Sequence, residues 1–249
     1  KAETAPDVTW TQLLGTSSND YSFEVATASD GSVYITGHTF GDLDGETNAG
    51  SNDGFLAKYS SDGTKTWTKL VGSSFQGAGI GVATASDGSV YITGRTNADL
   101  DGETHAGLFD AFLIKYASDG TKTWTKLLGT SFDDFGYGVV TASDGSVYIS
   151  GYTRGDLDGE TNTGSQNFEA FLTKYSSDGT KAWTKVLASS GRDDGFGVAT
   201  SSDGSIFITG QTNGDLDGET NAGLFDAFLT KYSSDGTKVW TQLLGTSSN

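Results

Sequence analysis

The sequence contains no cysteine, no methionine and only one proline among its 249 residues. Without cysteine, disulfide bridges, thiolate metal sites and cysteine nucleophiles are excluded, so packing, hydrogen bonds or hard ions must hold the fold. A chain that opens on Lys1-Ala2-Glu3 without an initiating methionine is expected to be a processed product or a fragment of a longer protein. No apolar run approaches roughly 18 residues, so the sequence predicts no membrane-spanning helix.

Basic residues are scarce, because 15 Lys and Arg stand against 32 Asp and Glu, which gives a formal net charge of −17. Nucleic acids and anionic lipids bind basic surfaces, so neither is an expected partner of this chain. The surplus of carboxylates is typical of a soluble protein and favours the collection of cations.

Tryptophan marks an internal repeat, since it occurs at positions 10, 67, 124, 183 and 240, at spacings of 57, 57, 59 and 57. Each Trp opens a W-T-[KQ]-[LV]-[LV] segment. A variable loop, a G-V-A-T-A-S-like run, S-V-Y-I-T-G, an acidic loop, D-A-F-L-x-K-Y and S-D-G-T-K then follow in order. Self-similarity at a fixed period is the signature of a repeat architecture.

Each repeat predicts four short strands, which in the second copy span residues 80–86, 89–96, 111–116 and 123–128. They show the alternation and the β-branched and aromatic content of strands. Asp-Gly pairs, which favour tight hairpin turns, separate the first strand from the second and the third from the fourth in every copy. A repeated four-stranded meander predicts an all-β fold, a β-propeller of four antiparallel blades of about 57 residues.

The stretch from Gly81 to Gly94, G-V-A-T-A-S-D-G-S-V-Y-I-T-G, and its three counterparts resemble the SBBP β-propeller repeat of bacterial proteins. The resemblance covers nearly the whole chain, implies a propeller fold and brings no catalytic residues with it. We therefore expect one propeller domain over residues 1–249, with blade repeats at about 20–72, 73–129, 130–188 and 189–245.

The two ends of the chain carry the same decapeptide, because residues 10–19 and 240–249 are identical. The Trp strand thus occurs five times and the other strands four times, and the N-terminal strand at 8–15 is available for ring closure. Closure removes the exposed sheet edges that invite aggregation. The repeat count favours a four-bladed monomer, and the alternative is a larger ring or strand-swapped dimer built from two chains.

The second and third strands of each repeat are joined by an acidic loop of the form D-L-D-G-E, and an acidic residue starts the third strand. Carboxylates at positions 1, 3, 5 and 12 are the calcium-binding pattern of EF-hand loops, although here the glycine stands at position 4 and no helices flank the loop. The alternative is a solvated turn in which Asp accepts backbone N–H bonds. The predicted Ca²⁺ ligands are Asp42, Asp44, Glu46, Asp53, Asp99, Asp101, Glu103, Asp110, Asp156, Asp158, Glu160, Glu169, Asp215, Asp217, Glu219 and Asp226.

The acidic loops share one face of the predicted propeller with the loops that join the fourth strand to the next repeat, which makes this face the expected place of binding. The latter loops vary most between the copies. Exposed aromatics there suit a protein or a glycan, and drift in an unconstrained loop is the alternative. Their distinctive residues are Tyr21, Phe75, Phe132, Phe135 and Arg192.

No nucleophile–base constellation stands out, and the two histidines, His38 and His105, occupy non-equivalent repeat positions. Glycosidases use paired carboxylates, but here these recur symmetrically in four copies, whereas an active site needs one asymmetric arrangement. The sequence therefore predicts a non-enzymatic, calcium-stabilised binding or scaffold module, extracellular or at the cell surface. The alternatives are a lectin-like propeller and, less favoured, a glycosidase- or lyase-like enzyme.

Overall fold

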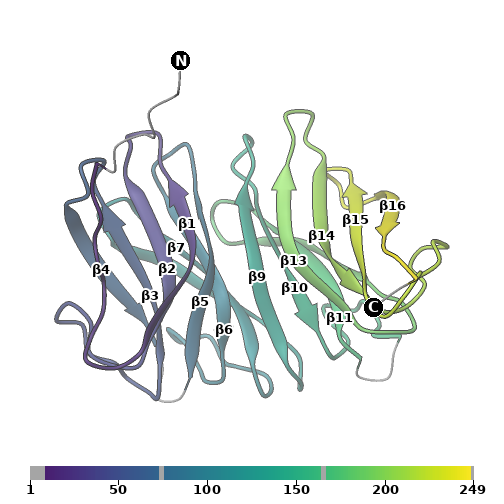
Figure 1. The fold of residues 1–249 in the computed structure, drawn as a ribbon, viewed down its shortest axis with the longest axis horizontal. Helices are drawn as coiled ribbons and strands as arrows, with labels where there is room; N and C mark the ends of the chain where they lie inside the picture. The colour runs from purple at the N-terminus through teal and green to yellow at the C-terminus, as the bar shows by residue number, and fades with distance from the viewer. Residues whose placement is uncertain (1–8, 73–75, 164–166, 248–249) are drawn as a thin grey trace.

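The protein is a β-propeller of four blades, each a four-stranded antiparallel sheet (Figure 1). The computed structural model describes residues 9–72, 76–163 and 167–247, and this part of the chain forms sixteen strands. The strands of each blade follow one another in chain order, as a meander. Within the described ranges there is no helix of the length and apolarity that crossing a membrane requires.

The bounds of the strands repeat closely from blade to blade. Blade 1 consists of β1 (Asp20–Thr27), β2 (Val33–Thr39), β3 (Asp53–Tyr59) and β4 (Lys65–Val71). Blade 2 consists of β5 (Gly77–Thr84), β6 (Val90–Thr96), β7 (Asp110–Tyr116) and β8 (Lys122–Leu128). Blade 3 consists of β9 (Asp134–Thr141), β10 (Val147–Thr153), β11 (Glu169–Tyr175) and β12 (Lys181–Leu187). Blade 4 consists of β13 (Asp193–Thr200), β14 (Ile206–Thr212), β15 (Asp226–Tyr232) and β16 (Lys238–Leu244).

The Asp-Gly pairs form the hairpins as the sequence predicts, with the positive φ on the glycine. In the turn between β11 and β12, Gly179 has φ 86° and its N–H bonds to the carbonyl of Ser176, while the N–H of Ser176 bonds to the carbonyl of Thr180. This is a type I turn closed by a glycine bulge, a common three-residue hairpin. All eight hairpins share the pattern.

The blades stand in a row, and the first strand of blades 2, 3 and 4 lies against the blade before it. Thus β5 packs on blade 1, β9 on blade 2 and β13 on blade 3. Blades 1 and 4 lie at opposite ends of the row (Figure 1). Among the described residues, the extensive packing that joins consecutive blades is not repeated between blade 4 and blade 1.

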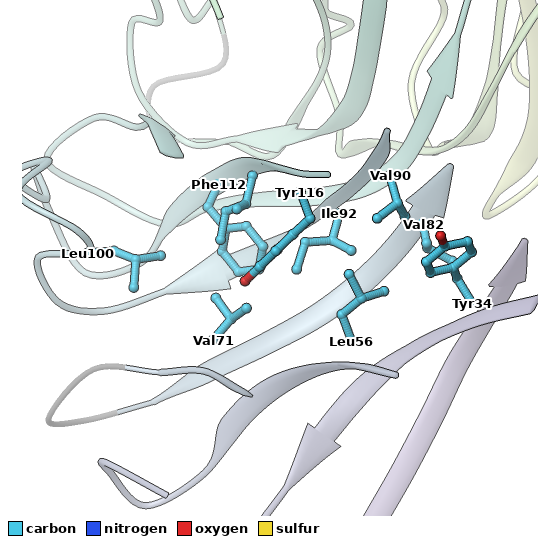
Figure 2. Packing of buried hydrophobic residues seen from close by; sticks show 10 residues of the cluster. Tyr34, Leu56, Val71, Val82, Val90, Ile92, Leu100, Phe112 and Tyr116 are labelled. Carbon is cyan, nitrogen blue, oxygen red and sulfur yellow. The ribbon is translucent and has the colours of Figure 1, made fainter. Parts of the chain in front are cut away.

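The hydrophobic core is divided into clusters that lie between blades. Figure 2 shows the cluster between blades 1 and 2, where Leu56 of β3 meets Val82 of β5, Ile92 of β6 and Phe112 of β7. Equivalent clusters fill the spaces between blades 2 and 3 and between blades 3 and 4. Because each sheet is apolar on both faces, it depends on a neighbour on each side to bury them.

The repeated tryptophans join neighbouring blades. Trp67 of β4 packs with Tyr34 of its own blade at a centroid distance of 5.9 Å, and its indole N–H donates to the carbonyl of Ser118 in the next blade at 3.3 Å. The ring also covers Gly120, where an added Cβ would lie 3.1 Å from Cδ2 of the indole. That glycine also has φ +86°, so the position requires glycine for both reasons.

The two copies of the terminal decapeptide have different places. β16, which carries Trp240, pairs with β15 and completes blade 4. Trp10 lies instead on the β3–β4 turn of blade 1, over Gly63, with its indole N–H donating to the carbonyl of Ser61 at 3.3 Å. The N-terminal segment therefore lies where the fourth strand of a preceding blade would lie.

We expect Leu113→Ala to destabilise the fold by about 3 kcal/mol, since Leu113 is 1% exposed in the cluster between blades 2 and 3 and truncation leaves a cavity. Urea unfolding followed by tryptophan fluorescence measures the change. The exposed Leu108 provides the control, because Leu108→Ala should cost less than about 0.5 kcal/mol. Equal losses in the two variants would contradict an inter-blade core.

Candidate functional site

The acidic D-L-D-G-E loops form tight turns on the side of the blades from which the first strands start, at the lower side of Figure 1. In blade 1 the N–H and carbonyl groups of Leu43 and Glu46 bond to each other in both directions at 3.0 Å. Asp44 and Gly45 between them have φ values of 54° and 85°, which is the type I′ turn that Asp-Gly favours. The Leu43 side chain is buried beneath the turn, and all four copies repeat this arrangement.

Each acidic side chain of the turn bonds to the fourth strand of its own blade. In blade 2, Asp101 pairs with Lys122 at 2.7 Å and accepts a hydrogen bond from Thr125 at 2.5 Å, while Glu103 pairs with Lys126 at 2.8 Å. Blades 1 and 3 have the same pairs. In blade 4 the second lysine is replaced by glutamine, and Gln242 donates to Glu219 at 3.4 Å.

The first and last carboxylates of the predicted ligand set bond to the backbone of the loop. In blade 1, Asp42 accepts from the N–H of Asn48 at 2.9 Å, and the buried Asp53 accepts from the N–H of Ala49 at 2.8 Å. In blade 3 the loop is two residues longer. Glu169, one methylene longer than Asp, there accepts from the N–H of Thr163 at 2.7 Å.

The structure thus places the four predicted ligands of each loop with separate protein partners. Within residues 9–72, 76–163 and 167–247, no three His, Asp or Glu side chains converge in a way that would hold a metal ion. The observed contacts are those of a turn stabilised by hydrogen bonds and ion pairs. Calcium binding by these residues stays a prediction of the sequence.

The second residue from the end of the second strand is one of the positions at which all four blades differ. It is occupied by His38, Arg95, Tyr152 and Gln211 in blades 1 to 4, each facing the start of the first strand of its blade. His38 lies among aromatic rings of its own blade, and burial lowers its pKa. His105 lies on the acidic loop of blade 2, so the two histidines do not share a site.

An arginine–aromatic cluster runs from blade 2 to blade 4 near the loop face. Arg95 lies over the ring of Phe135 at 4.2 Å, and Phe135 stacks on Tyr152 at 4.8 Å. Tyr152 meets Phe168 at 4.7 Å, and Arg192 lies over Phe168 at 4.0 Å. Cation–π contacts and ring packing therefore link three blades through residues that, apart from Phe168, are not repeated.

A cavity of about 420 Å³ opens beside this cluster on blade 3. It is lined by Phe132, by Arg154 and by residues of the acidic loop, among them Asp156 and Asn162. Arg154 lies over Phe168 at 4.9 Å and pairs with Asp133 at 2.9 Å. Of the aromatics predicted for this face, Phe132 lines the cavity, Tyr21 is exposed, Phe135 is buried, and Phe75 lies outside the described residues.

A second cavity, of about 280 Å³, lies where the first strands of all four blades approach one another. It is lined by Phe23 and Glu24 of β1, Ile80 of β5, and residues of β9 and β13 that include Tyr137 and Phe196. The Glu24 carboxylate accepts the N–H of Val82 in β5 at 2.7 Å. The other three blades have glycine where blade 1 has Glu24, so this carboxylate breaks the fourfold repetition.

Buried carboxylates recur where neighbouring blades meet. Burial raises the pKa of Asp134 to about 6, and the nearby carboxylate of Asp110 in the preceding blade adds to the rise. Burial likewise raises the pKa of Asp193 to about 6, with Glu169 as the neighbour. Hydrogen bonds from Thr130 and Ser189 oppose these rises only in part.

The SBBP family, described as a beta-propeller repeat, matches the chain at residues 123–158 and 182–217. The chain carries SBBP-type β-propeller repeats. Each match runs from the fourth strand of one blade through the first two strands of the next into its acidic loop. Each matched segment of this chain therefore spans an interface between blades.

Two curated proteins are similar to this chain over most of its length. The regulatory protein FlaEY of Caulobacter vibrioides is 30% identical over 189 residues, which cover 71% of this chain and 20% of the relative. An uncharacterized WD repeat-containing protein, L264, of Acanthamoeba polyphaga mimivirus is 22% identical over 238 residues, or 76% of this chain and 17% of the relative. The chain thus spans about a fifth of the length of these relatives.

A solved structure of a protein of unknown function from Bacteroides caccae aligns over 90% of this chain and 82% of its own, at 10% identity and a TM-score of 0.43. A likeness of this size adds no argument about fold or function.

Binding of a protein or a glycan and drift were both left open for the variable loops, and the arginine–aromatic cluster was not predicted from the sequence. A signal for it was present, because the protein has only three arginines, Arg95, Arg154 and Arg192. All three stand at the loop-side end of a strand or in the loop before one, in an otherwise acidic chain. Their convergence depends on the packing of blades 2, 3 and 4 against one another.

We expect the pH dependence of stability to report the buried carboxylates. Burial raises the pKa of Asp134 in the folded protein to about 6, above its ordinary value of 3.8, so the folded protein holds this proton to higher pH than the unfolded chain does. This contribution is complete below pH 3.8 and is lost as the pH rises to about 6. Over that interval the unchanged protein should lose on the order of 2 kcal/mol of its free energy of unfolding, and Asp134→Asn should not show this loss. Urea unfolding at several pH values measures the difference.

The exposed loop residue Asp215 provides the control, because Asp215→Asn should leave the same pH dependence as the unchanged protein. Parallel stability curves for Asp134→Asn and the unchanged protein would show that Asp134 does not titrate in this range.

Proposed function

We propose that this chain is a non-enzymatic binding module that engages a protein partner through the loop face of blades 2 to 4. The observation that carries the proposal is the arginine–aromatic cluster with its adjoining cavity of about 420 Å³. Arginine and aromatic side chains are the residues enriched at the energetic centres of protein interfaces. Apart from Phe168, the cluster is built from positions where the near-identical repeats diverge, which supports selection for a particular partner.

The names of the two relatives are consistent with a binding role. One is named a regulatory protein and the other a WD repeat-containing protein. The acidic loops support a role outside catalysis, because the Asp before the loop glycine has the same lysine and threonine partners in every blade. An extracellular or cell-surface setting, expected from the sequence, belongs to the same proposal.

Selection of random peptides on the immobilised protein tests the binding role. We expect selected peptides to lose at least about tenfold in affinity for the Phe168→Ala variant, because this ring holds Arg154 and Arg192 in place. Phe225 occupies the same repeat position in blade 4 and is exposed, so Phe225→Ala is the matched control and should bind like the unchanged protein.

A glycan array run in parallel separates the lectin-like alternative, which is favoured by Phe132 beside the polar lining of the cavity. Glycan binding that is lost in Phe132→Ala, with no peptide selected, would overturn the protein-binding proposal in favour of the lectin. Peptides that bind Phe168→Ala and the unchanged protein equally would exclude the cluster as the binding site.

Calcium stabilisation of the loop face is the second part of the proposal. It is supported by the charge left after pairing, since each loop of blades 1 to 3 sets four carboxylates against two lysines, and that of blade 4 sets four against one. A divalent cation would lower the repulsion among them. We expect EDTA to lower the melting temperature by several degrees and added Ca²⁺ to restore it, as measured by calorimetry. An unchanged melting curve would contradict calcium stabilisation, and the ion pairs with lysine would then be what offsets the repulsion among the carboxylates.

A further inference from the structure

The two ends of the blade row expose the surfaces that interior blades bury against each other (Figure 1). At the blade 4 end, Leu229 of β15 is 42% exposed, whereas its counterpart Leu113 is 1% exposed. At the blade 1 end, Val25 of β1 is 60% exposed, whereas its counterpart Val82 is 4% exposed. One end therefore presents the face that receives a following blade, and the other presents the face that receives a preceding blade.

The terminal tryptophans each make half of the contacts of an interior one. Trp10 has the contact with a following blade, because its ring covers Gly63 and its N–H bonds to Ser61. Trp240 has the contact within its own blade, with the ring of Phe207 at 6.1 Å. A blade that carried Trp240 and lay beside blade 1 would make both contacts, as Trp67 does between blades 1 and 2.

In each copy of the duplicated segment one leucine is packed into a core and the other is exposed. Leu14 packs into the core of blade 1, while Leu13 next to it is 95% exposed. In the C-terminal copy Leu243 packs into the core between blades 3 and 4, while Leu244 is 80% exposed. A single segment that combined the partners of Leu14 with those of Leu243 would bury both of its leucines.

The groove beside blade 1 is incompletely filled by the N-terminal segment. A cavity of about 250 Å³ remains between residues 12–14 and the strands β1, β2 and β3. At interior interfaces the carbonyl of the β-turn serine also accepts a lysine ammonium from the preceding blade, as Ser118 accepts Lys58 at 2.9 Å. The corresponding lysine for Ser61 is Lys231, at the far end of the row in blade 4.

We propose that blade 4 of one chain docks on blade 1 of a second copy, with β16 replacing residues 10–14 of that copy. The occupant is a second copy because the segment already seated in the groove has the same sequence as the strand that would displace it. The new interface repeats the one seen three times between consecutive blades. It is head-to-tail, so it joins different surfaces of the two chains.

The two tryptophans give a test with opposite signs. Trp240→Ala removes the anchor of the docking strand and should abolish association, whereas Trp10→Ala weakens the competing segment and should strengthen association by about tenfold. Sedimentation velocity of the full chain over a wide concentration range measures both against the unchanged protein. A change of the same sign in both variants would overturn displacement of the N-terminal segment.

Face variants test the surfaces themselves. Leu229→Asp and Val25→Asp should each give folded monomers, while Leu224→Asp, at another exposed leucine, should associate like the unchanged protein. Mixing the two monomeric variants should restore a complex through one intact interface. An unchanged protein that is monomeric at all concentrations, or a mixture of the two that stays monomeric, would overturn the proposal.

Discussion

The packing of one blade face on the next is the interaction on which the rest of this structure depends. Each sheet is apolar on both sides, so a single blade cannot bury its own hydrophobic surface, and the core exists only between blades. Trp67 of β4 and Trp124 of β8 set the spacing of the blades, because each ring packs on a glycine of the next blade's hairpin and each indole N–H donates to a carbonyl there. Interior blades satisfy this requirement on both sides, and the terminal blades satisfy it on one.

The loop face combines a repeated element with a unique one. The repeated element is the acidic type I′ turn, in which a buried leucine, a pair of backbone hydrogen bonds and lysines of the same blade hold the carboxylates in place. The unique element is the chain of contacts from Arg95 to Arg192 through three aromatic rings. Repetition supplies a rigid frame, and departure from repetition at a few positions supplies a surface that differs from blade to blade.

Much of the fold could be predicted, because every level of the sequence indicates the same unit. The Asp-Gly pairs fix the hairpins, alternation fixes the strands, and the 57-residue spacing fixes the blades. The role of the acidic loops was harder to predict, because D-L-D-G-E fits both a cation-binding loop and a tight turn. The spacing alone does not show that Asp101 bonds to Lys122 and Thr125. The arginine–aromatic cluster was missed because its members are far apart in sequence and meet only when three blades pack together.

The sequence by itself determined the strands, their turns and the number of blades, because these follow from local patterns copied four times. It also showed that the terminal decapeptides are identical. Only the tertiary structure decided where each copy lies. Both copies have the same strand pattern, and their positions depend on the strands and blades that surround each of them. β16 pairs with β15 by backbone hydrogen bonds, whereas residues 10–14 lie on blade 1 with Trp10 seated on Gly63. Identical sequences thus occupy different environments, because packing against neighbouring blades is a property of the whole arrangement.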